Sequence, residues 1–309
     1  MAADDHDGAW AWLAGPKGAR LVHLTSAGVE TSISVPGEFG SSAPMPQALA
    51  VCDGQVWAGI GRQVVRFDQA GRAHAIDLPD SQPIPGIDAH RPPELRGLAQ
   101  VSHLACADSG VLAGLTNSAD AFAITDAADT IRPIPLPAGH QLTALASAAD
   151  GSAVLAVQEP GTDGGQLLYR DPQGNLEPGQ SRTTANLLSN GNGYVTGNAR
   201  LTVTGADAGS IDEVAGRPSA LLPNGDIATT ADNGGLHVVA PDGTVREVAI
   251  GSVDQCGFGP SVMPVGPEPQ PRTSTECPLG AKTVVAAPDG SVYVAVAAAV
   301  DPRIVRVQL

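Results

Sequence analysis

The sequence predicts an all-β protein folded as a single β-propeller of seven four-stranded blades, with six blades as the alternative. Three observations support this fold class. A repeat with a period of roughly 40–50 residues, typical of propeller blades, occurs about seven times. Short runs rich in Val, Ile and Thr are separated by Asp-Gly and Asn-Gly pairs, which favour tight hairpins. No stretch shows the 3.6-residue apolar period of an amphipathic helix.

The clearest copy of the repeat spans residues 47–79 and reads QALAVCDG-QVWAGIGR-QVVRFDQAG-RAHAIDLP. It contains four β-type runs separated by turn residues, as an antiparallel meander requires. The pattern returns in 220–250, and its first three strands return in 283–309. Less regular copies begin near His103, Thr143 and Ala185.

Each copy has a first turn that contains glycine. These turns are at Gly54, Gly110, Gly151, Gly191, Gly225 and Gly290. A further copy begins at Gly8 and lacks its first strand, while the copy in 283–309 lacks its outer strand. How the ring closes is therefore left open.

The composition excludes several classes of function. The formal net charge is −15, with 17 basic against 32 acidic residues, so the chain is a poor candidate for binding nucleic acid or an anionic membrane surface. The longest strongly apolar run, VYVAVAAAV (292–300), is too short to be a transmembrane segment.

The repeat carries the elements x-x-L-A-x-x-x-D-G and V-x-R-F/V-D/A-x-x-G. In these it resembles the superfamily of NHL-repeat, SMP-30/gluconolactonase-like and virginiamycin-B-lyase-like propellers. The resemblance covers most of the chain and implies a blade rather than a reaction, because propellers host many unrelated functions. It also implies that connections between the outer strand of one blade and the inner strand of the next lie on the ligand-binding face.

Two of those connections are long. We expect one domain over residues 1–309, with a flexible N-terminal tail at 1–7 and long loops at 80–97 and 253–280 on one face. Cys256 and Cys277 flank the Pro-rich part of the second loop. We expect a disulfide between them, which would contribute roughly 3 kcal/mol by closing a loop of about 20 residues.

The cysteines also bear on the compartment. Cys52 and Cys106 lie near the ends of neighbouring inner strands, and they either bridge two blades or remain buried thiols. A disulfide requires an oxidising compartment, so we expect an extracytoplasmic protein whose leader is not part of this sequence. It would be secreted or lipid-anchored at the cell envelope. The Ala/Arg-rich, Lys-poor composition indicates a GC-rich bacterium such as an actinobacterium.

We expect any site at the mouth of the central tunnel, where ligands favour the openings of closed β structures. Polar residues entering the inner strands there are Gln47, Gln100, His103, His140, Gln141, Thr184, Asn186, Arg217, Ser219 and Lys282. The loop at 80–97 adds His90, Arg91, Glu94 and Arg96. This set fits a protein partner or a small polar, anionic or carbonyl-bearing ligand. We expect a monomer.

The leading hypothesis is thus a binding platform of the cell envelope. The alternative is a metal-dependent hydrolase or lyase acting on a cyclic ester, as the resemblance implies, with His103 or His140 as general base. The related lactonases present Glu, Asp and Asn ligands to a divalent ion such as Ca²⁺ or Mg²⁺. Here no carboxylate begins an inner strand, and Glu94, Glu159, Asp163, Asp232 and Asp301 fall in loops. The sequence therefore implies no firm cofactor.

Overall fold

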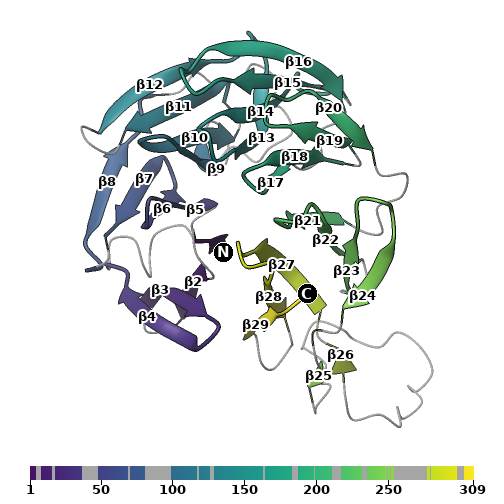
Figure 1. Ribbon diagram of the computed structural model, residues 1–309. Coiled ribbons are helices and arrows are strands. Elements are labelled where there is room, and N and C mark those ends of the chain that lie inside the picture. Colours follow the sequence, from purple (N-terminus) through teal and green to yellow (C-terminus); the bar gives the residue numbers. More distant parts are fainter. Residues whose placement is uncertain are drawn as a thin grey trace, which may run out of the picture.

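The computed structural model is a ring of seven antiparallel β-sheets arranged as a propeller (Figure 1). It describes residues 1–4, 8–15, 18–36, 48–68, 70–80, 99–116, 118–125, 129–162, 164–182, 187–197, 199–210, 217–231, 235–248, 250, 252–253, 277–278, 280–297 and 303–309. Seven blades confirm the predicted fold class and exclude the six-blade alternative.

Each blade is a meander formed by one continuous segment, with its first strand nearest the axis (Figure 1). Blade one comprises β1 (Ala2–Ala3), β2 (Ala9–Gly15), β3 (Gly18–Thr25) and β4 (Gly28–Ser34). Blade two comprises β5 (Ala48–Cys52), β6 (Gln55–Ile60), β7 (Gln63–Phe67) and β8 (Ala73–Asp77). Blade three comprises β9 (Gln100–Ala107), β10 (Gly110–Thr116), β11 (Asp120–Thr125) and β12 (Thr130–Pro135). Blade four comprises β13 (Gln141–Ser147), β14 (Ala153–Gln158), β15 (Gly165–Arg170) and β16 (Leu176–Arg182).

The remaining blades follow the same order. Blade five comprises β17 (Leu187–Ser189), β18 (Gly193–Thr196), β19 (Ala199–Thr202) and β20 (Asp207–Ser210). Blade six comprises β21 (Arg217–Leu221), β22 (Ile227–Thr230), β23 (Leu236–Val239) and β24 (Val245–Val248). Blade seven comprises β27 (Gly280–Ala286), β28 (Val292–Ala297) and β29 (Arg303–Val307).

Apolar side chains hold neighbouring blades together. The described residues form seven buried apolar clusters, one between each pair of adjacent blades. The blades approach so closely that a Cβ atom at Gly59 of β6 would lie 2.7 Å from the carbonyl oxygen of Val101 in the next blade. Glycine at this position therefore permits the packing distance between blades two and three.

A disulfide joins blades two and three. Cys52 ends β5 and Cys106 lies near the end of β9, with their Cα atoms 5.4 Å apart. The bridge confirms the first of the two alternatives for this pair. Cys256 lies outside the described residues, so the bridge between Cys256 and Cys277 stays a prediction.

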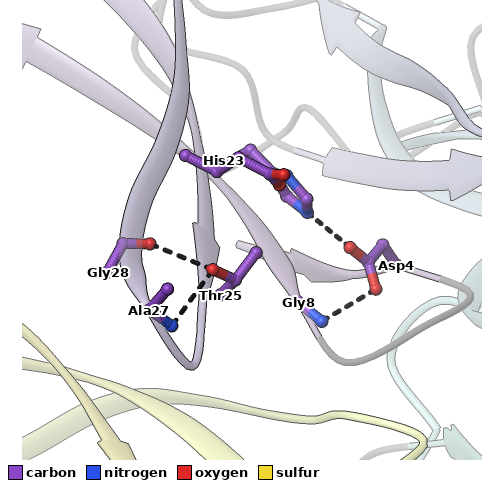
Figure 2. A network of polar contacts seen from close by, with 7 residues as sticks. Asp4, Gly8, His23, Thr25, Ala27 and Gly28 are labelled. Carbon is purple, nitrogen blue, oxygen red and sulfur yellow. Dashed lines mark hydrogen bonds and ion pairs between the residues drawn. The ribbon is translucent and has the colours of Figure 1, made fainter.

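The first blade corrects the sequence analysis. The predicted tail at 1–7 and the missing first strand are wrong for the described part, because Ala2 pairs with Trp10 and Ala3 with Ala9. Asp4 anchors this short strand (Figure 2): its carboxylate accepts a hydrogen bond from the Gly8 backbone N–H at 2.9 Å and contacts His23 Nε2 at 2.5 Å. The sequence analysis missed this strand because it is only two residues long and is followed directly by acidic residues.

His23 is held from three sides. Its Nδ1 lies 2.8 Å from a carboxylate oxygen of Glu30, and Trp10 stacks on its ring with centroids 4.8 Å apart. Since Asp4 contacts the other ring nitrogen, the imidazole connects β1 to the two outer strands of blade one. This network holds the N-terminal residues in the ring.

The last blade has three strands in the described chain, β27, β28 and β29. Blade seven packs directly on blade one through Tyr293 and Ile304 on one side and Ala9 and Leu24 on the other. Side-chain packing between the two blades therefore closes the ring.

The expected loop at 253–280 is shorter than predicted. Ser252 pairs with Pro278 and Val253 with Cys277, which forms a two-stranded ladder from β25 (Ser252–Val253) and β26 (Cys277–Pro278). The loop at 80–97 lies, apart from Asp80, outside the described residues. No helix able to cross a bilayer is found in the part of the chain that the structure describes.

Replacing both Cys52 and Cys106 by Ala should lower the free energy of unfolding by about 4 kcal/mol, because the bridge closes a loop of 54 residues in the unfolded chain. Urea unfolding of the double variant and of the wild type measures this. A Cys52→Ser/Cys106→Ser variant should lose a similar amount, because both variants remove the same bridge and differ only in the side chains left behind. An unchanged urea midpoint in the Cys52/Cys106 variant would contradict the stabilising role.

Candidate functional site

A cavity of about 360 Å³ lies among the inner strands of blades three to seven, at the axis of the ring. It is lined by His103, Thr143, Ala144, Leu145, Leu187, Leu188, Pro218, Ser219, Thr283 and Val284. One part of this lining is aliphatic and the other consists of one imidazole and three hydroxyl groups. None of these lining residues carries a carboxylate, lysine or arginine side chain.

A β-bulge recurs in four of the inner strands. The register of β9 skips Ser102, that of β13 skips Thr143, that of β21 skips Ser219 and that of β27 skips Lys282. A bulge adds one residue to a strand and redirects the side chains next to it. Two of the bulge residues, Thr143 and Ser219, line the cavity, and so do His103 and Thr283, which directly follow the other two.

His103 is the titratable group of the cavity lining. Burial lowers the pKa of this histidine below its ordinary value, because an imidazolium would lose its hydration there. At neutral pH the ring is therefore uncharged, with one nitrogen that donates a hydrogen bond and one that accepts. The packing that buries it is close, since a Cβ atom at Gly114 of β10 would lie 3.4 Å from the His103 Cβ and 2.0 Å from Leu142 Cδ2.

The hydroxyl groups of the bulge residues are fixed by their own blades. Thr143 donates to the carbonyl oxygen of Ala156 at 3.1 Å. Ser219 donates to the carbonyl oxygen of Arg217 at 3.0 Å, and its oxygen lies 3.2 Å from the Thr230 hydroxyl. Since both hydroxyl groups donate within their own blades, their protons are not directed into the cavity.

The structure brings only part of the predicted site to the cavity. His103 and Ser219 line it, and Lys282 stands at the bulge of β27. Gln100, Gln141 and Arg217 begin their strands but do not line the cavity. His140 is partly buried, its Nδ1 lies 3.1 Å from the carbonyl oxygen of Ala138, and it is not among the residues that line the cavity with His103.

Most of the remaining predicted residues lie outside the part of the chain that the structure describes. Six predicted residues lie outside the described part of the chain: Gln47, His90, Arg91, Arg96, Thr184 and Asn186. Among the carboxylates considered as metal ligands, Glu159 is exposed and Glu94, Asp163, Asp232 and Asp301 also lie outside. Within the described residues, no three His, Cys, Asp or Glu side chains are grouped so that they could hold a metal ion.

Sequence reasoning missed Thr143 and Thr283. A signal for Thr143 is present, because the inner strands of blades three, four and six begin Gln100-Val-Ser, Gln141-Leu-Thr and Arg217-Pro-Ser. Aligning these starts places a hydroxyl residue at the third position each time, which is the bulge. Thr283 follows Lys282 in blade seven and has no such signal.

No family model and no curated protein matches this sequence. Solved structures do match its fold. "Streptogramin B lyase structure" is 16% identical with a TM-score of 0.56, over 98% of this chain and 93% of that one. "Crystal Structure of Mitotic Checkpoint Complex" includes a chain that is 14% identical with a TM-score of 0.61, over 100% of this chain and 86% of that one.

A third structure, of a puromycin hydrolase, is 15% identical with a TM-score of 0.59, over 98% of this chain and 50% of the other. The chain therefore spans about half the length of that enzyme. At these identities the likeness shows the fold alone. It supports the β-propeller architecture, and it leaves open whether the chain is an enzyme or a binding protein.

The His103 environment predicts a pH dependence of stability. The folded state lowers the pKa of His103 below the ordinary histidine value of about 6.5. Below that pH, His103 of the unfolded chain binds a proton that the folded chain does not bind. The contribution of His103 to stability is therefore complete above that pH and is lost as pH falls toward the folded-state pKa. Urea unfolding at pH 7.5 and 5.5 should show a smaller loss for His103→Gln than for wild type. The control His140→Gln, which lies outside the cavity lining, should behave as wild type, and equal losses in all three proteins would refute the assignment.

Proposed function

We propose that this chain is an exported binding protein that takes a small, uncharged, polar ligand in the axial cavity. The observation that carries the proposal is the composition of the cavity lining: one neutral imidazole, three hydroxyls and an aliphatic wall. Such a surface offers hydrogen-bond acceptors and one N–H donor, together with apolar contact. A ligand with carbonyl and hydroxyl or amide groups on a partly apolar body fits it better than an anion does, because none of the described lining residues carries a cationic side chain.

The export part of the proposal is supported by the disulfide between Cys52 and Cys106. Structural disulfides persist in oxidising compartments and are rare in the cytosol of most organisms. A lipid anchor, a GC-rich bacterial source and a monomeric state stay predictions from the sequence.

A thermal-shift screen of neutral lactones, amides and polyols tests the ligand class. A binder at a hundredfold excess over its Kd should stabilise the wild type by about 2.7 kcal/mol. His103→Ala should lose most of this shift, because the imidazole is removed from the cavity. His140→Ala should keep it, since His140 is not in the lining. A shift that is the same in all three proteins would place the binding elsewhere and contradict the proposal.

A second candidate is a lyase or hydrolase acting on a cyclic ester, and one observation favours it. The lowered pKa of His103 leaves a ring nitrogen able to accept a proton at neutral pH, as a general base must. The described donor set does not supply a metal site, so we derive no step through a metal.

Melting with a chelator and then with added Ca²⁺ or Mg²⁺, followed by an ester and lactone activity screen, tests this second candidate. If it is right, turnover should fall at least tenfold in His103→Ala and persist in His140→Ala, since general-base catalysis contributes a factor of roughly 10² or more. Turnover that survives in His103→Ala, or no turnover of any tested ester by the wild type, would remove the candidate.

A further inference from the structure

Blade seven has an outer edge that no other described strand covers. Its third strand, β29, pairs with β28 on one side, and none of its backbone groups bonds to a described residue on the other side. In the other six blades the outermost position is filled by a fourth strand (Figure 1). An uncovered edge offers a row of backbone donors and acceptors to which an extended segment can add.

Four sister blades show what normally fills this position. Their fourth strands each place one aliphatic residue opposite a buried residue of the third strand. The pairs are Ile33 with Leu21, Ile76 with Val64, Ile134 with Ala121, and Val248 with Leu236. All eight residues are buried in the apolar cluster that faces the next blade.

Ile304 occupies the corresponding register in blade seven. It pairs with Ala295 of the second strand, as Val64 pairs with Gly59 and Ala121 with Gly114. Val64 is 0% and Ala121 1% exposed, whereas Ile304 is only partly buried. It packs against the cluster between blades seven and one, in which no fourth-strand residue takes part. The apolar surface that the fourth strand would cover is therefore still open at Ile304.

The sister strands also specify the sequence of a complementary segment. A second apolar residue follows two positions after the first, at Val35, Leu78, Leu136 and Ile250, and it packs in the same cluster. In three of the four the next residue is proline, which ends the strand: ISVP, IDLP and IPLP. The shared pattern is Ile-x-Val/Leu-Pro.

We propose that the outer edge of β29 is a docking site for an extended segment of a partner protein, which adds as the fourth strand of blade seven. The segment carries two aliphatic residues two positions apart, in the pattern Ile-x-Val/Leu-Pro. The first lies against Ile304 and the second reaches toward blade one. Backbone hydrogen bonds supply general affinity, and the two aliphatic side chains supply selectivity.

Other occupants fit less well. The connection between Val253 and Cys277 has no aliphatic-x-aliphatic-Pro sequence. A second copy of the chain brings a formal net charge of −15 to a protein that already carries −15, so the two copies repel each other. A neutral or basic partner avoids that repulsion.

The first test uses the peptide RAHAIDLP, which is residues 72–79 of this chain, labelled for fluorescence anisotropy. The control peptide carries Ile76→Ser and Leu78→Ser. The parent peptide should bind the protein, and the control should bind roughly tenfold or more weakly, because two buried aliphatic side chains are lost. Equal binding of the two peptides, or no binding of the parent at millimolar protein, would overturn the proposal.

The second test places the strand in the same chain. Residues 68–79 are grafted directly after Val307, since β29 (RIVRV) aligns with β7 (QVVRF). The graft should raise Tm by a few degrees over a control graft with Ile76→Ser and Leu78→Ser, and it should abolish binding of the free peptide. Peptide binding that survives the graft would show that the peptide binds elsewhere. A dimer of the ungrafted protein that the graft dissociates would assign the edge to a second copy. Either result overturns the partner-segment proposal.

Discussion

Every blade of this propeller is apolar on both faces and is stable only between two neighbours. The apolar clusters lie between blades, and the blades meet so closely that Gly59 admits no side chain against Val101. Burying apolar surface on both faces is the main favourable term in the stability of such a ring. The position of every inner strand, and with it the axial cavity, follows from this packing.

The cavity is produced by a departure from regular pairing. Bulges in four inner strands add a residue where a continuous ladder would have none, and they bring hydroxyl side chains to the axis. His103 follows one of these bulges, and its burial keeps the imidazole neutral. The chemistry of the site is thus a consequence of register as much as of residue type.

In the part of the chain that the structure describes, the ring closes without exchange of strands between its two ends. The N-terminal strand belongs to blade one, where Asp4 and His23 hold it, and blade seven packs on blade one through apolar side chains. Within the described residues the last blade has three strands, and Ile304 is incompletely covered. The aliphatic residues that fourth strands place in the clusters of the sister blades therefore define which segment would fit beside Ile304.

The sequence by itself determined the propeller fold class and the hairpin turns, and it favoured seven blades over six. These depend on local patterns: alternation of apolar residues, and glycines such as Gly54 and Gly151 that adopt positive φ in the turns. Only the tertiary structure decided that Cys52 bonds to Cys106, that Ala2–Ala3 completes blade one, and that His103 lines the cavity while His140 does not. These outcomes depend on contacts between segments far apart in the chain and on one-residue shifts of register, and neither is encoded in a local pattern.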